Sequence, residues 1–370
     1  MQDNEEGTLK TAEDYFAMAK ECFDGSDWDG VITNLNETIR LKPDMEIAWN
    51  NRGNAWRRKG EDDKAISDYD QAIRLKPDYA DAWFNRGNAR KRKGEYDEAI
   101  SDYDQAIRLE PKEAATWFQR GEVWTQKGEL DKALDDMTEA IHLKPDYADA
   151  WFNRGNIWGT KGEQDKAIYD YNQAIHLEPN NAGAWHNRGT AWAEKEIFDK
   201  SLHDYDEAIR LKPDDADAWA NRGMVLGSMD ELEKSLDDFN EAVRLKPDHA
   251  RAWNNLGIIW RRKGNLNKAF ACFDKAIRLD PKDADAWCNR GNIWMRKNEL
   301  DKALKDLNES IRLKPNFIHA LNNRGLINVQ KENYDEAIAD FDEILRLDAD
   351  NQTAIGNRAV TLKRKNASKT

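Results

Sequence analysis

Side-chain amides recur every 34 residues along most of this 370-residue chain. The series consists of Asn51, Asn85, Gln119, Asn153, Asn187, Asn221, Asn255, Asn289, Asn323 and Asn357. An asparagine side chain offers two N–H donors and a carbonyl acceptor, so a row of them can pair with an extended backbone whatever its sequence. The series therefore predicts a peptide-binding track. The alternative interpretation is that these amides cap or bridge neighbouring helices of the protein itself.

Aromatic and basic residues beside this series predict further ligand contacts. Phe84, Phe118 and Phe152 each precede an amide of the series, which indicates either an apolar anchor site or packing on the adjacent unit. Basic residues lie six or seven positions after an amide of the series, near both ends of the series: Arg57, Arg58, Lys91, Arg92, Arg261, Arg262 and Arg296. We predict anionic-ligand patches at these two ends, although basic residues in the last turn of a helix also favour its dipole.

Residues capable of catalysis or metal binding form no comparable pattern. The six histidines occupy five different places relative to the 34-residue period, without metal-ligand spacing: His142, His176, His186, His203, His249 and His319. Three cysteines without CxxC spacing indicate neither a disulfide framework nor a zinc site. Recurrent acids such as Asp68 and Asp70 are interpreted as a solvated outer face. The sequence predicts a protein that is not an enzyme and holds no cofactor or metal.

The elements that must position these residues follow from a lattice of prolines. All nine prolines are spaced by 34 residues: Pro43, Pro77, Pro111, Pro145, Pro179, Pro213, Pro247, Pro281 and Pro315. With proline at position 32 of each unit, tryptophan occupies position 4 in eight units and position 11 in six. Apolar or small residues at positions 4, 8, 11, 20, 24 and 27 recur at helical spacing, which predicts two amphipathic helices per unit with tryptophan in the core.

The junctions between these helices also have chemical signals. Glycine at position 15 can take the left-handed conformation that ends a helix, and it occurs at Gly60, Gly94, Gly128, Gly162 and Gly264. After Pro77, Asp78 is predicted to cap the first helix of the next unit.

The pattern W-x2-RG-x2-W, then A-x3-[YF]-x2-A, then P resembles the tetratricopeptide repeat family over roughly residues 12–365. The resemblance implies an all-α fold, a right-handed superhelical solenoid of antiparallel helix hairpins with the first helices on its inner wall. The amide series resembles the asparagine ladder of O-linked N-acetylglucosamine transferase. We expect no catalytic domain after it, so the resemblance implies binding rather than glycosyl transfer.

The lattice also sets the expected boundaries. We expect a flexible N-terminal segment at residues 1–11, a C-terminal solvating helix at 352–365 and a tail at 366–370. Between them lie ten units of 34 residues: 12–45, 46–79, 80–113, 114–147, 148–181, 182–215, 216–249, 250–283, 284–317 and 318–351.

We therefore predict a scaffold or adaptor that binds an extended peptide segment of a partner protein in its concave groove. One alternative is a self-associating homo-oligomer, which a strict monomer in light scattering would exclude. Another is single-stranded RNA binding through the basic patches. The net charge of -13 disfavours nucleic acid and anionic membranes. No stretch approaches the roughly 18 apolar residues of a membrane-spanning helix. Because the three cysteines indicate no disulfide framework, a reducing, cytoplasmic location is expected.

Overall fold

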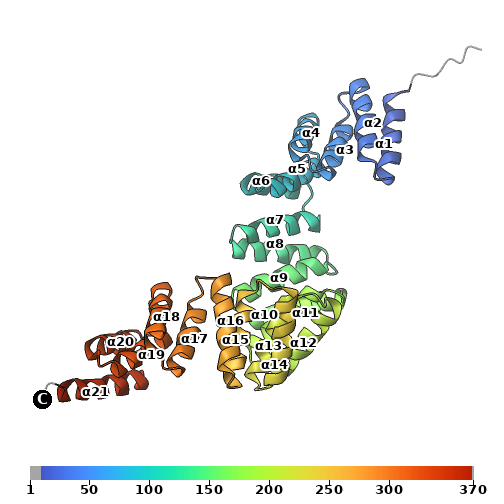
Figure 1. The fold of residues 1–370 in the computed structure, drawn as a ribbon. Helices are drawn as coiled ribbons and strands as arrows, with labels where there is room; N and C mark the ends of the chain where they lie inside the picture. Colours follow the sequence, from blue (N-terminus) through green and yellow to red (C-terminus); the bar gives the residue numbers. More distant parts are fainter. Residues whose placement is uncertain (1–9, 369–370) are drawn as a thin grey trace, which may run out of the picture. The chain divides into compact units, whose positions relative to one another are not determined.

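The computed structural model of the chain describes residues 10–368. Over this range the backbone forms 21 α-helices and no strand (Figure 1), which confirms the predicted all-α fold. The helices divide into two compact units, residues 1–191 and 192–370. Most of the expected flexible N-terminal segment lies outside the described residues.

The first unit contains ten complete helices and most of an eleventh. Their bounds are α1 Ala12–Asp24, α2 Trp28–Leu41, α3 Glu46–Arg58, α4 Asp62–Leu75, α5 Ala80–Lys93, α6 Tyr96–Leu109, α7 Ala114–Gln126, α8 Leu130–Leu143, α9 Ala148–Thr160, α10 Gln164–Leu177 and α11 Ala182–Glu194. From α1 to α10 each helix packs against the next, and α3, α5, α7 and α9 also contact one another in succession.

The second unit repeats the same arrangement. Its helices are α12 Phe198–Leu211, α13 Ala216–Ser228, α14 Leu232–Leu245, α15 Ala250–Arg262, α16 Leu266–Leu279, α17 Ala284–Arg296, α18 Leu300–Leu313, α19 Ile318–Gln330, α20 Tyr334–Leu347 and α21 Gln352–Ala367. The first helices α13, α15, α17, α19 and α21 contact one another in succession. Each unit is thus a stack of helix hairpins.

The turn after α5 has the conformation predicted from the sequence, whereas the turn before α5 does not have the predicted cap. Gly94, which ends α5, has a φ of 79°, the left-handed value that was predicted for position 15. The predicted cap at Asp78 is wrong, because the N-cap of α5 is Tyr79 and no side chain accepts a hydrogen bond there. A side-chain hydrogen bond joins α5 to the turn before it instead, because Trp83 Nε1 donates to the Pro77 carbonyl at 2.9 Å.

Glycine at position 8 lets an aromatic ring of the second helix approach the first. A Cβ on Gly87 would lie 2.7 Å from Cε1 of Tyr103, closer than real carbon contacts allow. The Tyr103 ring is fully buried, and its hydroxyl donates to Asn88 Oδ1 at 2.9 Å. The tryptophans, expected in the core, lie half-buried at its edges and pack against the buried clusters.

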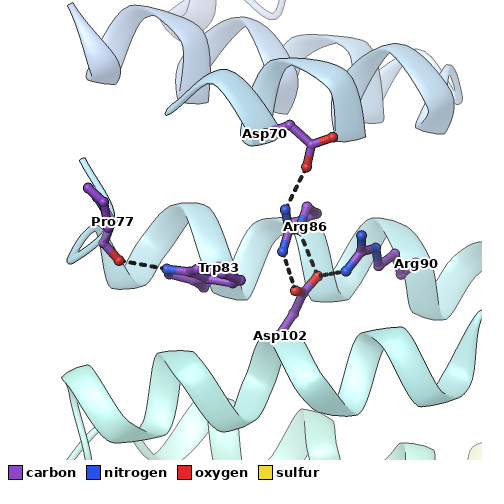
Figure 2. A network of polar contacts seen from close by, with 6 residues as sticks. All are labelled: Asp70, Pro77, Trp83, Arg86, Arg90 and Asp102. Carbon is purple, nitrogen blue, oxygen red and sulfur yellow. Dashed lines mark hydrogen bonds and ion pairs between the residues drawn. The ribbon is translucent and has the colours of Figure 1, made fainter. Parts of the chain in front are cut away.

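Arginine at position 7 joins three helices through one guanidinium (Figure 2). Arg86 on α5 donates from Nε and Nη2 to the two carboxylate oxygens of Asp102 on α6, at 3.0 and 2.6 Å. Its Nη1 donates to Asp70 of the preceding repeat at 2.5 Å, and its guanidinium carbon lies 4.6 Å from the Trp83 ring centroid. Such a clamp fixes each first helix against its own partner and against the previous hairpin.

The same clamp recurs in both units. The corresponding pairs are Arg52–Asp68, Arg120–Asp136, Arg154–Asp170, Arg222–Asp238, Arg290–Asp306 and Arg324–Asp340. The interpretation of Asp68 as a solvated acid is therefore wrong, because this carboxylate is 4% exposed and paired with Arg52. Repeat 250–283 has lost both partners together: Leu256 and Cys272 stand at the two positions and pack in one apolar cluster.

Candidate functional site

A cavity of about 1140 Å³ lies along the first helices of the second unit. We call it the α15–α19 groove, because its walls are α15, α17 and α19 together with the turns before α17 and α19. Three members of the amide series line it, Asn255, Asn289 and Asn323. Residues at the neighbouring positions 5, 9 and 12, which vary between repeats, line it too, among them Cys288, Asn292 and Arg261.

Many amides of the series bond to the preceding first helix of their own unit. In the groove, Asn289 Nδ2 donates to Asn254 Oδ1 at 3.0 Å and Asn323 Nδ2 to Asn292 Oδ1 at 2.7 Å. Equivalent bonds are Asn85 to Asn50, Asn187 to Asn156 and Asn357 to Asn322. These contacts support the alternative interpretation that the amides bridge neighbouring helices.

A bond between neighbouring helices uses only some of the donors and acceptors of each amide in the series. Each bond takes one of two N–H donors, and the carbonyl oxygen is not involved. In the groove, Asn255 is half-buried and makes no side-chain hydrogen bond to the described residues. The peptide-binding role of the series therefore stays a prediction, with Asn255 as the member best placed to serve it.

The three phenylalanines differ in their access to a ligand. Phe118 is only 6% exposed and packs on Tyr147 with ring centroids 4.8 Å apart, so we now assign it to the core. Phe84 and Phe152 are half-buried, with their rings 6.0 and 6.1 Å from those of Tyr103 and Tyr171. Much of the expected anchor site is thus packed against aromatic residues of the same chain.

Two of the four predicted basic residues of the first unit, Lys91 and Arg92, are paired with acids. Lys91 Nζ donates to Glu122 Oε2 at 2.9 Å and to Gln119 Oε1 at 2.5 Å. Arg92 donates to the Arg57 carbonyl at 2.9 Å and lies 3.5 Å from the Asp62 carboxylate. The guanidinium of Arg58 lies 5.9 Å from the Trp28 ring centroid. Lys91 and Arg92 are thus compensated by acids of the chain, whereas Arg57 and Arg58 have no acidic partner within 4 Å among residues 10–368.

The second unit differs at two of its three arginines. Arg262 is bonded to the Gly227 carbonyl and to Asp230, the latter at 2.8 Å. Arg261 and Arg296 both line the α15–α19 groove, and neither has an acidic partner within 4 Å among residues 10–368. Burial, together with the nearby charges of Arg296 and Arg262, lowers the pKa of Arg261.

The side chains of the groove show no arrangement for metal or nucleophilic chemistry. Among the described residues, no three histidine, cysteine or acidic side chains come together as metal ligands would. Burial raises the pKa of the Cys288 thiol to about 11, so it stays protonated near neutral pH. No helix within residues 10–368 has the length and apolar character needed to cross a bilayer.

The contacts of the clamp arginines were not predicted from the sequence, although the sequence contains a pattern that indicates them. Arginine and aspartate recur with a spacing of 16 residues in most repeats, as in Arg86 and Asp102, and both are replaced together at Leu256 and Cys272. Joint loss of two residue types indicates a direct contact. Lysine at position 14 has a similar partner in the preceding repeat, for example Lys161 with Asp131 at 2.8 Å.

Family models for the tetratricopeptide repeat match the chain in both units. Two models cover single repeats at residues 80–113, 148–181, 216–249, 250–283, 284–317 and 318–351. A third, described as TPR repeat, matches residues 53–94 and 121–159. The chain belongs to the tetratricopeptide repeat family. Its 34-residue period and stacked hairpins are those of this family, and the solenoid fold class predicted from the sequence is confirmed.

Solved structures agree with the tetratricopeptide repeat fold. The Cut9–Hcn1 hetero-tetramer of the APC/C matches over 96% of this chain and 97% of its own, at 12% identity and a TM-score of 0.54. A tetratricopeptide repeat protein from Parabacteroides merdae covers 67% of this chain and 98% of its own, at 18% identity and a TM-score of 0.54. These likenesses show the fold alone. No curated protein matches the chain.

Tetratricopeptide repeat proteins are generally non-catalytic scaffolds for protein interactions, and membership in the family supports that broad role here. The family does not by itself specify a partner.

Proposed function

We propose that this tetratricopeptide repeat protein is a non-catalytic scaffold that holds an extended peptide segment of a partner protein in the α15–α19 groove. The observation that carries the proposal is the cavity of about 1140 Å³ along three successive first helices, lined by amides of the 34-residue series. An extended chain presents N–H and C=O groups at regular intervals, and amide side chains can pair with both.

The bonds between neighbouring amides support this role as well as the fold. Asn289 and Asn323 are held in place by their bonds to Asn254 and Asn292, so their remaining polar atoms are already oriented. A pre-positioned row of polar groups lowers the entropy cost of binding a flexible segment. Asn255, without such a bond among the described residues, is the side chain whose loss should affect binding with least effect on packing.

Comparative affinity capture tests the proposal. We expect Asn255→Ala to lose partners that the unmodified chain and Asn240→Ala retain. Asn240 is exposed on the second helix α14, so it serves as a matched control. A captured partner should also slow amide hydrogen exchange in α15, α17 and α19. Identical partners for the two variants, with no added protection of these helices, would refute peptide binding in this groove.

A further inference from the structure

The α15–α19 groove carries a local surplus of positive charge although the whole chain is acidic. Five basic side chains line it, Arg251, Arg261, Lys282, Arg296 and Lys314. Only three acidic side chains do so, Asp280, Asp283 and Asp285. A cavity with a surplus of one sign of charge attracts ligands of the opposite sign, even on a protein whose net charge is -13.

The three acids lie at one end of the groove and two of them serve the protein backbone. Asp283 caps α17 and accepts from the N–H groups of Asp285 and Ala286 at 2.9 and 3.1 Å. Asp280 accepts from the Lys282 N–H at 3.0 Å. Arg261 and Arg296 lie in the last turns of α15 and α17, at the other end of these helices. No acidic side chain lines the groove at that basic end.

Comparison between repeats explains why Arg261 lacks an acidic partner. Lys91 holds the same repeat position in the first unit, and Glu122, 31 residues later, binds it. The residue 31 positions after Arg261 is Asn292, which carries no charge. The carboxylate that compensates Lys91 is thus replaced by an amide at Arg261, as it also is at Arg57, where Asn88 stands 31 residues later.

Arg296 has lost its acidic partners in the same way. Arg92 lies near Asp62, 30 residues earlier, whereas the residue at that distance from Arg296 is Leu266. Arg262 binds Asp230, 32 residues earlier, whereas the residue at that distance from Arg296 is Gly264. Two neighbouring repeats therefore present arginines to one groove without the acids that pair with Lys91, Arg92 and Arg262.

We propose that the basic end of the groove binds clustered carboxylates of an acidic peptide segment, with Arg261 and Arg296 as the anion-binding pair. The inference rests on the proposed function and adds the chemistry of the bound segment. A guanidinium offers parallel N–H donors that match a carboxylate, and such charged bonds are stronger than neutral ones. Two like charges that line one cavity also repel each other until an anion lies between them.

The test uses the full-length chain and a fluorescein-labelled peptide with a central run of aspartates. Its reference is the same peptide with asparagine in place of each aspartate. Binding is measured by fluorescence anisotropy at low salt. We expect the aspartate peptide to bind about tenfold or more tightly than the asparagine peptide. In Arg261→Gln/Arg296→Gln that preference should disappear, while the asparagine peptide binds as before.

Two further variants make the test specific. Arg58→Gln/Arg92→Gln removes the same charge from the first unit and should leave the preference for aspartate intact. Asn292→Glu supplies at Arg261 the acid that Glu122 provides to Lys91, so it should weaken binding of the aspartate peptide without removing an arginine. This second variant keeps the test valid if the double arginine variant folds poorly.

Several results would overturn the inference. Equal binding of both peptides would reject the acidic preference and leave the proposed function standing, whereas binding of neither would reject both. Equal losses in the two double variants would show a general effect of charge. Tighter binding of the matching phosphoserine peptide would assign the pair to phosphate, and tighter binding of a short single-stranded RNA would assign the surface to nucleic acid.

Discussion

Arg154 contacts groups from three helices and shows how one side chain stabilises two hairpins. It donates to the two carboxylate oxygens of Asp170 at 2.8 and 2.9 Å and to the Thr138 hydroxyl at 3.1 Å. Its guanidinium carbon lies 4.8 Å from the Trp151 ring centroid. The Asp170 carboxylate is almost fully buried, so its charge depends on this one arginine.

Removal of that arginine should destabilise the protein strongly. We expect Arg154→Leu to lower the free energy of unfolding by about 3–5 kcal/mol, because a buried carboxylate is left without its partner. Arg154→Leu/Asp170→Cys reproduces the natural pair Leu256 and Cys272 and should recover most of the loss. Urea unfolding followed by circular dichroism measures both.

A control separates this effect from a general loss of charge. Arg244 pairs with Glu241 on the exposed face of α14, so Arg244→Leu should change the unfolding midpoint little. A double variant no more stable than Arg154→Leu alone would contradict the assigned coupling.

At the scale of the element, each hairpin depends on the close approach of its two helices. In the third repeat, Gly87 on α5 faces Tyr103 on α6, and the ring fills the space that a larger residue would need. Trp83 joins the same hairpin to the preceding turn through Pro77. Packing in this hairpin therefore sets a size limit at position 8.

Two glycine substitutions test this limit. Gly87→Ala should lower the free energy of unfolding by about 1–3 kcal/mol, because its Cβ would overlap the buried Tyr103 ring. The melting temperature should fall accordingly. Gly356→Ala is the matched control, since no atom lies within 4 Å of a Cβ there and alanine favours a helix by about 1 kcal/mol. The melting temperature should fall in Gly87→Ala and rise in Gly356→Ala. Equal shifts in the two variants would show that contact with the Tyr103 ring is not the cause.

At the scale of the whole molecule, each hairpin packs on its sequence neighbours within its unit, so stability is the sum of repeats and their interfaces. The last described helix, α21, covers the end of the second unit. Its Ala354 packs with Leu321, Phe341 and Ile344 of α19 and α20. The outer face of α21, expected to be solvating, is only partly polar, because Ile355 and Val360 are 42% and 51% exposed.

Truncation of the chain after residue 351 should therefore loosen its immediate neighbours first. We expect faster amide hydrogen exchange in α19 and α20, because their buried apolar side chains lose the cover of α21. Exchange in α13 and α14 serves as the internal control and should change little. Equal acceleration in both pairs of helices would mean that the second unit unfolds as one cooperative block.

The sequence alone determined the period, the helical hairpins and the family, because these depend on local signals repeated many times. Proline, the position-4 tryptophan and the position-15 glycine recur at fixed spacing, and each acts within a few residues of itself. The cap predicted at Asp78 failed because Tyr79 took that place and the Trp83 bond to Pro77 marks the junction.

Only the tertiary structure decided which charged and polar side chains are available to a ligand. Asp68 and Asp70 look alike in the sequence, yet Asp68 is buried under Arg52 and Asp70 is exposed beside the next repeat's arginine. The basic residues of the two units also look alike, but Lys91 and Arg92 are paired with acids, whereas Arg261 and Arg296 line the α15–α19 groove without an acidic partner among residues 10–368. The physical reason is that compensating charges lie about thirty residues away along the chain and meet only when hairpins stack.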